Sequence, residues 1–535
     1  MLYPQYKVAV KRMFIYLTRS RFYSGLILLL SALVLWSLST QVQARMQTSD
    51  SENFQPYFDK IVERVTEFTL DNGMKFIVLE NHTAPVFSSI TYADVGGVDE
   101  PEGKTGVAHF LEHLAFKGTK DIGTTNYQAE TKLLERLDRL SEQIRVAKAA
   151  DDRAKAEKLE AEFIRVQTQA SQYVNQNEYA QIVKTAGGIG LNAATSADYT
   201  KYFYSFPSNK LELWMALESD RFLEPVFREF DREKEVILEE RYQRTDNSPE
   251  GKAVERLLEV AFTEHPYGNP VIGYEEDIRN LTREDVQQFF ETYYSPNNLT
   301  VAIVGDVEPQ QVEELAQTYF GRYEAKPEPP KVTVVEPEQT KTREVTIEFP
   351  AQPIYLEGYH RPAITDADDV VYEVIEYLLS IGRTSRLYKS LVKDKQIAVG
   401  VTGVDCFPGD KYPSLLLFSA TTAPDRSVDE VEQAFREEIE RLKTEPVTEP
   451  ELERVRNDLR VGLLKTLDSN LDMADLLALF ETNTGSWQKL FEELEMFATI
   501  SPADVQRVAQ KTFTPENRTI VRLVPPSSEG DSGDS

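Results

Sequence analysis

The segment from Gly106 to Thr119 contains the residues best suited to metal chemistry in this chain. Its apolar residues recur with the spacing of a buried helix, which places His109 and His113 about one turn apart on the same face. Two imidazoles in this arrangement can hold one metal ion. Glu112 directly precedes the second histidine, so its carboxylate can approach the same ion without being a ligand.

The pattern H-x-x-E-H predicts a zinc-dependent hydrolase. Catalytic zinc sites use three protein ligands and leave one position for water. We therefore expect His109 and His113 to be ligands, and Glu112 to be the general base that accepts a proton from the attacking water. The pattern is the reverse of H-E-x-x-H and is a metallopeptidase signature. The alternative is that both histidines are structural residues of an apolar helix.

Several segments beyond this helix resemble peptidase family M16, which includes pitrilysin, insulinase and the mitochondrial processing peptidases. The similarity runs from about Val65 to the end of the chain. It is carried by Asp71-Asn-Gly-Met-Lys, Gly96-Gly-Val, Leu191-Asn-Ala-Ala-Thr-Ser, Arg232-Glu-Lys-Glu-Val-Ile-Leu-Glu-Glu, His265-Pro-Tyr-Gly and Asn298-Leu-Thr-Val-Ala-Ile-Val-Gly-Asp. The resemblance implies an α+β protein with two homologous halves of the LuxS/MPP-like metallohydrolase fold. Each half would pack an antiparallel-rich sheet against helices.

The third metal ligand lies in a strong helix-forming segment, residues 230–241. The resemblance assigns this role to Glu240. Glu233 lies about two turns earlier on roughly the same face, where it would accept a hydrogen bond from an imidazole and fix the ring's orientation. Glu235 and Glu239 are expected on the solvated face. One zinc ion per chain is expected, in the first half.

Residues 187–196 precede an alternating segment, residues 199–206, that predicts a strand. Glycine and other small residues let a second backbone approach closely, and an exposed sheet edge can bind an extended peptide as an added strand. The resemblance implies that Asn192 and Ala193 contact the substrate. The alternative is an ordinary edge strand with glycine at its start.

The other histidines and the single cysteine indicate no further metal site. His265 and His360 lack a metal-ligating partner three or four residues away and are interpreted as structural, and His82, in a turn, is left out of the metal candidates for the same reason. The lone Cys406 excludes an internal disulfide and makes a thiolate metal site implausible. The net charge of -29 argues against nucleic acid as a partner, and fits either the attraction of basic peptides or an acidic surface kept for solubility.

The first 44 residues predict targeting rather than fold. A basic stretch precedes the apolar run Gly25–Leu38, and small residues near Ala44 offer a cleavage site. We expect a signal peptide and export to the periplasm. The alternative is an uncleaved anchor that holds the protein on the membrane, facing the periplasm. Residues 45–64 are predicted to be an extended linker, and the acidic tail 527–535 to be disordered.

The catalytic half is predicted over residues 65–325. It opens with a hairpin that turns at Asn72 and Gly73, followed by a strand near residues 88–95. Residues 127–178 carry leucines at helical spacing among many charges, with a break between Ala149 and Arg153. They predict an inserted helical hairpin. A lid, a docking arm and a solvated appendage are all compatible with this pattern.

The chain also repeats itself. Residues 285–301 match residues 504–520 without gaps, an offset of 219 that indicates duplication. The Pro-rich segment 326–341 is the predicted linker, and residues 342–526 the second half. In that half Glu373 and Tyr377 stand where the two histidines stand in the first, so no second metal site is expected. In M16 peptidases such halves close around the peptide.

One departure from the family pattern bears on activity. Active single-subunit relatives carry an Arg and a Tyr that hold the substrate and polarise its carbonyl, whereas both positions look like valine here, at Val392 and Val399. Loss of such a group costs orders of magnitude in rate. We therefore expect this chain to be the zinc-bearing subunit of a heterodimer with a second M16-type subunit, or to form a homodimer.

The resulting prediction is a zinc-dependent endopeptidase that hydrolyses peptides or small unfolded proteins. A non-catalytic scaffold or binding subunit of an M16-type complex is the main alternative, although a scaffold would not need His109, Glu112, His113 and Glu240 together. A membrane-tethered chaperone is a third hypothesis. It rests only on the N-terminal apolar run and the helical hairpin.

Overall fold

The computed structural model describes residues 55–526. The predicted signal peptide or anchor over residues 1–44 and the tail 527–535 lie outside the described residues. Part of the expected extended linker is instead helix α2 (Gln55–Val62), so that prediction is wrong there. Its one proline falls in the first turn, where a missing N–H costs no helical hydrogen bond. In the part of the chain that is described, no helix is both long and apolar enough to cross a membrane.

The first sheet contains six strands in the order β1-β2-β6-β3-β5-β4. Strands β2 and β6 are parallel, and the other neighbours are antiparallel. The strands are β1 (Val65–Thr69), β2 (Lys75–Glu80), β3 (Val86–Ala93), β4 (Ile189–Thr195), β5 (Thr200–Pro207) and β6 (Leu299–Gly305). The β1–β2 hairpin turns where the sequence predicts, and Gly73 adopts the positive φ of 92° that the turn requires.

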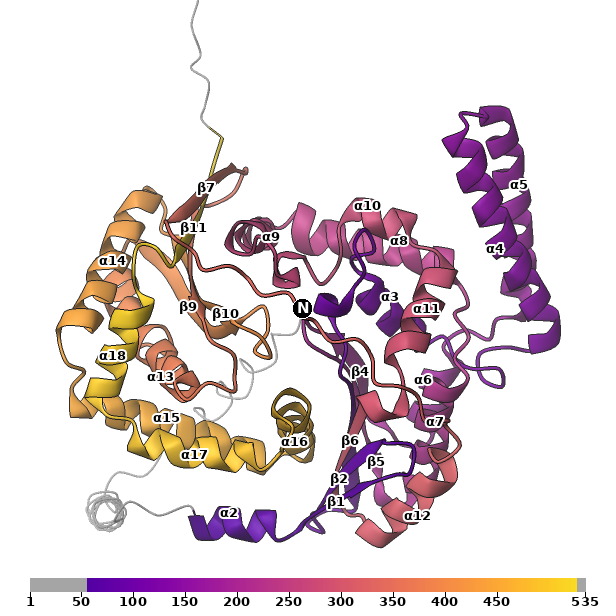
Figure 1. Cartoon of the computed structure of the whole chain (residues 1–535), viewed down its shortest axis with the longest axis horizontal. Helices are drawn as coiled ribbons and strands as arrows, with labels where there is room; N and C mark the ends of the chain where they lie inside the picture. The colour runs from indigo at the N-terminus through magenta and orange to yellow at the C-terminus, as the bar shows by residue number, and fades with distance from the viewer. Residues whose placement is uncertain (1–54, 527–535) are drawn as a thin grey trace, which may run out of the picture. The chain divides into compact units, whose positions relative to one another are not determined.

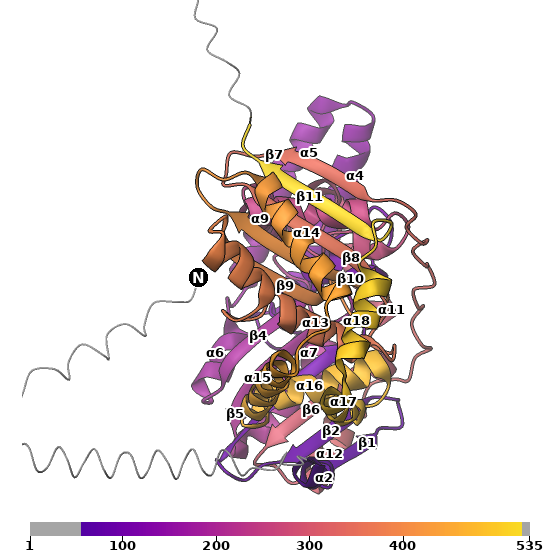
Figure 2. The ribbon, with the colours of Figure 1, turned by 90° about the vertical axis from the view of Figure 1, so that its left-hand side faces the viewer.

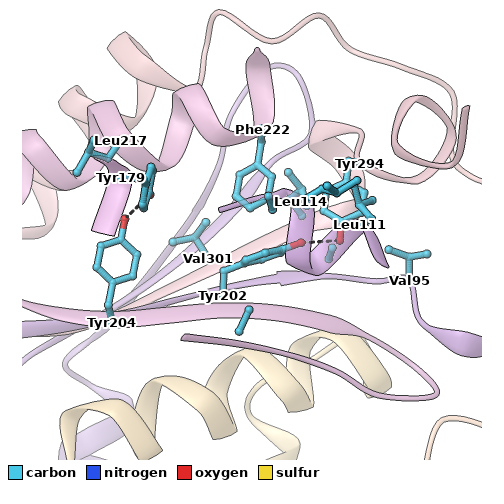
Figure 3. Close-up of a cluster of buried hydrophobic side chains, with 14 of the residues drawn as sticks. Val95, Leu111, Leu114, Tyr179, Tyr202, Tyr204, Leu217, Phe222, Tyr294 and Val301 are labelled. Atoms are coloured by element: carbon cyan, nitrogen blue, oxygen red, sulfur yellow. Dashed lines mark hydrogen bonds between the residues drawn. The ribbon is translucent and has the colours of Figure 1, made fainter. Parts of the chain in front are cut away.

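The helices of the first half are α3 (Val107–Leu114), α4 (Tyr127–Ala149), α5 (Arg153–Ala170), α6 (Glu178–Thr185), α7 (Leu211–Leu223), α8 (Phe230–Arg241), α9 (Pro249–Ala261), α10 (Glu275–Asn280), α11 (Arg283–Tyr293) and α12 (Pro309–Tyr319). Figure 3 shows the core between this sheet and its helices, where Leu111 and Leu114 of α3 lie near two buried tyrosines. The hydroxyls of Tyr202 and Tyr294 are 3.0 Å apart and satisfy each other within this apolar layer.

Helices α4 and α5 form the predicted hairpin and lie side by side in Figures 1 and 2. The base of the hairpin is fixed by an ion pair with almost no solvent exposure: Arg228 Nε donates to Glu130 at 2.9 Å. The same guanidinium also donates to the backbone carbonyls of Lys117, Thr119 and Ile122. Breaking a buried pair of this kind costs about 3–5 kcal/mol, so the hairpin base is firmly attached to the segment that follows α3.

The second half repeats this plan around a sheet in the order β7-β11-β8-β10-β9, in which β7 and β11 are parallel. Its strands are β7 (Arg343–Glu348), β8 (Ile354–Arg361), β9 (Ala398–Phe407), β10 (Ser414–Thr422) and β11 (Arg518–Val524). Its helices are α13 (Asp369–Leu379), α14 (Val428–Thr444), α15 (Glu449–Leu467), α16 (Asn470–Thr484), α17 (Lys489–Thr499) and α18 (Pro502–Thr512). Helix α18 and strand β11 follow α11 and β6 at an offset of 219 residues in both cases, which confirms the duplication.

Each half contributes one helix that packs on the sheet of the other half. Helix α9 of the first half packs on β7, β8 and β11 of the second sheet, where Leu257 meets Leu356 and Val521 in one buried cluster. Helix α16 of the second half packs on β3 and β6 of the first sheet. There Asp475 accepts a hydrogen bond from Tyr92 Oη at 2.5 Å and pairs with Lys201 Nζ at 2.8 Å. The halves that the resemblance expects to close around a peptide are therefore in direct, interlocking contact.

Candidate metal centre

Helix α3 is fixed in place at its start. Gly106, which precedes the helix, has a φ of 86°, and a Cβ atom there would lie 2.7 Å from the carbonyl oxygen of Ile272. The carboxylate of Glu100 accepts hydrogen bonds from the backbone N–H groups of Gly106 at 2.8 Å and Ala108 at 2.9 Å. Since the first N–H groups of a helix have no partner within the helix, Glu100 satisfies donors that would otherwise be buried unpaired.

The two histidines of α3 and Glu240 of α8 come together, and their ligand atoms all lie within 4.8 Å of one another. Glu240 Oε2 is 3.8 Å from His109 Nε2 and 3.4 Å from His113 Nε2. Tetrahedral zinc bonds of about 2.0–2.1 Å would place two ligand atoms about 3.4 Å apart. The donor set, two imidazoles and one carboxylate, therefore fits a zinc ion in both chemistry and spacing.

The outward nitrogens of the imidazoles face different surroundings. His113 Nδ1 lies 2.9 Å from Glu233 Oε1, and the other oxygen of Glu233 pairs with Lys117 Nζ at 2.5 Å. A carboxylate on Nδ1 leaves Nε2 free to bind a metal. His109 Nδ1 is buried and has no hydrogen-bond partner among the described residues, so its ring is held by packing.

The electrostatics of the cluster fit a cation-binding site. Burial and the neighbouring His113 lower the pKa of His109 to about 4, which keeps its imidazole neutral. Burial opposes protonation of His113 as well, but the hydrogen bonds to Glu233 and Glu240 outweigh it and raise its pKa to about 9. The hydrogen bond from His113 lowers the pKa of Glu240. The proton that His113 holds between these two carboxylates is the positive charge that a bound metal ion would replace at Nε2.

Glu112 lies on the same helix and is 9% exposed. Thr195 Oγ1, at the end of β4, donates a hydrogen bond of 2.9 Å to Glu112 Oε2. Burial raises the pKa of Glu112, and the Thr195 hydrogen bond opposes this rise. The carboxylate is therefore oriented by β4 while its basicity is increased by burial, as a general base requires.

Three contacts of this cluster are absent from the sequence-based prediction. These are the hydrogen bond from Thr195 to Glu112, the ion pair of Lys117 with Glu233, and the ion pair of Arg244 with Glu240 Oε1 at 3.0 Å. Arg244 lies in a π-helical turn, Tyr242–Asp246, directly after α8. Its spacing of four residues from Glu240 is a signal from which the pair could have been predicted.

The segment expected to contact substrate forms the edge of the first sheet. Strand β4 pairs with β5 only, and no other described strand covers its outer side. Asn192 is exposed there, whereas Ala193 is buried beneath the strand. Because β4 also carries Thr195, one strand supplies both a free edge and the donor to Glu112.

The remaining histidines differ in their surroundings. His265 Nδ1 accepts a hydrogen bond from the backbone of Tyr267, and His360 Nε2 lies 3.1 Å from the carbonyl oxygen of Ala261. His82 has metal-ligating neighbours after all, because its ligand atom and those of Glu80 and Glu308 lie within 4.8 Å of one another. This group is largely exposed, and it forms because the parallel strands β2 and β6 end side by side.

In the second half, α13 occupies the place of α3. Helix α13 packs on α18 and β9 as α3 packs on α11 and β4, and it carries Glu373, Glu376 and Tyr377, which the sequence aligns with His109, Glu112 and His113. Burial and Asp405 raise the pKa of Glu376 to about 8. The described residues of this half contain no group of three metal-ligating side chains within reach of one ion.

The two valines of the expected substrate-holding positions lie on neighbouring elements. Val392 packs at the edge of the second core, in the π-helical turn Tyr388–Asp394. Val399 is 55% exposed on β9, the edge strand of the second sheet. Neither side chain can donate a hydrogen bond to a substrate carbonyl.

Comparison with known families matches both halves. The family model described as Insulinase (Peptidase family M16) matches residues 75–135 and 163–275. The model described as Peptidase M16 inactive domain matches residues 280–459. The break between residues 135 and 163 falls inside the α4–α5 hairpin, so residues 136–162 are an insertion relative to that family model.

Individual relatives agree with these matches. Zinc protease PqqE of Helicobacter pylori is 29% identical over 467 residues, which cover 85% of this chain and 92% of that protein. Probable mitochondrial-processing peptidase subunit beta of Arabidopsis thaliana is 24% identical over 476 residues, which cover 86% of this chain and 78% of that protein.

Solved structures show the same architecture. The crystal structure of a protease from Helicobacter pylori has a TM-score of 0.73 at 28% identity and covers 86% of this chain and 99% of that one. The periplasmic protease PqqL from Escherichia coli has a TM-score of 0.63 at 17% identity and covers 86% of this chain and 48% of that one. This TM-score shows a shared fold. With both family domains matched in order along a two-half fold, this chain belongs to peptidase family M16.

Proposed function

We propose that this chain is a zinc-dependent endopeptidase that hydrolyses peptides or small unfolded proteins. The observation that carries the proposal is the convergence of His109, His113 and Glu240 on one point, with Glu112 on the same helix. His109, His113 and Glu240 would hold the ion, and Glu233 would keep the His113 ring in the orientation that binding needs.

A bound zinc ion would make water acidic and polarise a peptide carbonyl. Glu112 would take the proton from the attacking water and pass it to the leaving amine. The free edge of β4 would align the substrate as an added strand, with Asn192 and Ala193 in contact with it. This division of roles places the scissile bond beside Glu112, because Thr195 ties the same strand to its carboxylate.

The test of the proposal is metal dependence. The purified chain is expected to contain one zinc ion and to hydrolyse an internally quenched peptide. A chelator should abolish hydrolysis, and zinc should restore it. Atomic absorption spectroscopy measures the zinc content, and fluorescence measures the rate of peptide hydrolysis, on the same samples. A non-catalytic scaffold would instead retain zinc without hydrolysing the peptide in any assembly, and that result would contradict the proposal.

Thr195 is expected to position the general base. Thr195→Val keeps the shape of the side chain but removes the donor to Glu112, so kcat should fall about tenfold through loss of orientation, with zinc content and KM nearly unchanged. Thr195→Ser keeps the hydroxyl and serves as the matched control. Loss of activity in Thr195→Ser with parent-like activity in Thr195→Val would show that the methyl group matters rather than the hydrogen bond.

We also propose that the chain works with a second M16-type subunit, or as a homodimer, after export to the periplasm. Val392 and Val399 supply no donor to a substrate, and a peptidase subunit named beta among the relatives supports a paired assembly. The chain alone is then expected to hydrolyse peptides at least about a hundredfold more slowly than the complex that co-purifies with it from the periplasmic fraction. Equal turnover by the isolated monomer would refute this part.

A further inference from the structure

A cavity of about 640 Å³ lies between the inserted hairpin and the helix that carries Glu240. Helices α4 and α5 form one wall, and the starts of α8 and α11 form the other. Its volume falls within the range of about 300–1,000 Å³ typical of ligand sites. Five lining residues lie in the stretch 136–162 that the M16 family model does not match, so the insertion supplies part of one wall: Leu137, Asp138, Ser141, Glu142 and Arg145.

The floor of the cavity is apolar. Leu134, Leu137 and Phe163 line it from the hairpin, and Phe227 and Phe230 line it from the start of α8. These rings and aliphatic side chains can bury the apolar side chains of a ligand, a contribution of about 25 cal/mol per Å² removed from water.

The rim of the cavity is acidic. Each arginine that lines it is already neutralised by a carboxylate: Arg228 by Glu130, Arg283 by Asp138, Arg145 by Glu142, and Arg232 by Glu229. Three further lining carboxylates, Asp231, Glu235 and Glu284, make no ion pair with any side chain in residues 55–526. Lys234 interacts electrostatically with Asp231 and Glu235 and offsets one of these three charges. The charge left over after pairing is therefore negative.

We propose that this cavity binds a peptide segment in which apolar residues are flanked by lysine or arginine. The apolar side chains would occupy the floor, and the cationic groups would pair with Glu235, Glu284 and Asp231 at the rim. Glu235 precedes Glu240 by five residues, about 7–8 Å along the axis of α8, so the bound segment lies near the metal centre but outside it. The inference concerns binding alone and goes beyond the proposed hydrolysis.

Fluorescence anisotropy tests this proposal on the full chain with Glu112→Gln, which keeps the probe from being cleaved. The probe is a short labelled peptide of alternating lysine and leucine, and its counterpart carries glutamate in place of lysine. The lysine peptide is expected to bind, and more weakly as salt is added, whereas the glutamate peptide is not. Reversing the rim with Glu235→Lys and Glu284→Lys should weaken binding about tenfold or more.

The matched control reverses two exposed acids that do not line the cavity, with Glu157→Lys and Glu313→Lys, and should bind like the parent. A second variant, Ser141→Phe, fills the cavity without changing charge and should also weaken binding. Parent-like affinity in both cavity variants would overturn the proposal. The proposal would also be overturned if the cavity variants left binding unchanged and removal of zinc abolished it, because that result would place the peptide at the metal centre.

Discussion

Glu112→Gln is expected to lower kcat for peptide hydrolysis by about 10²–10⁴-fold while the zinc content of the protein stays the same. The amide has nearly the shape of the carboxylate and can still accept a hydrogen bond from Thr195. It cannot take a proton from water at neutral pH. The change therefore removes the base and leaves the three metal ligands in place.

The measurement is a comparison of steady-state hydrolysis with metal analysis on the same preparation. Glu239→Gln is the matched control, because Glu239 is exposed on α8, and its carboxylate contacts Gln243 rather than the metal centre. The control should retain full activity. Parent-like hydrolysis by the Glu112 variant would show that another group acts as the base.

Glu240→Ala is expected to reduce zinc affinity by more than about a hundredfold and to abolish hydrolysis. Loss of a carboxylate that only supports a ligand costs about 10–100-fold in metal affinity, so Glu233→Gln should have the smaller effect of the two. This order follows from the geometry, because Glu240 approaches the Nε2 atoms of both histidines, whereas Glu233 contacts only Nδ1 of His113.

Competition with a fluorescent zinc chelator gives the affinity of each variant. Glu239→Ala, one residue away from the ligand, controls for the loss of a carboxylate from α8. If Glu233→Gln loses more affinity than Glu240→Ala, the assignment of ligand and supporting residue must be exchanged. Equal zinc affinity in all variants would exclude Glu240 from the metal centre.

The parts of the fold that depend on local spacing could be predicted from the sequence. Helix α3 follows from its apolar periodicity, and the hairpin break between Ala149 and Arg153 from its composition. The position of Glu233 relative to Glu240 follows from helical geometry alone. Two turns of α8 bring both carboxylates to His113.

Contacts between distant segments could not be predicted in this way. Thr195 lies 83 residues from Glu112, and its role depends on the register of β4 at the sheet edge. His82 acquires Glu308 as a neighbour because β2 and β6, far apart in sequence, are parallel partners, whereas Glu80 is only two residues away. The helix over residues 55–62 does not follow from local sequence, because a helix of eight residues is too short to be stable on its own propensity.

The packing of α9 and α16 on each other's sheets explains why the half that lacks the candidate metal centre persists. Each sheet packs against a helix that the other repeat encodes, so deleting the second repeat would remove α16 from the first sheet and leave α9 without a surface to cover. Mutations can therefore change the metal-ligating positions of one repeat, but not the helix and sheet that the other repeat needs. Selection for a single metal centre thus also preserves the repeat that does not contain it.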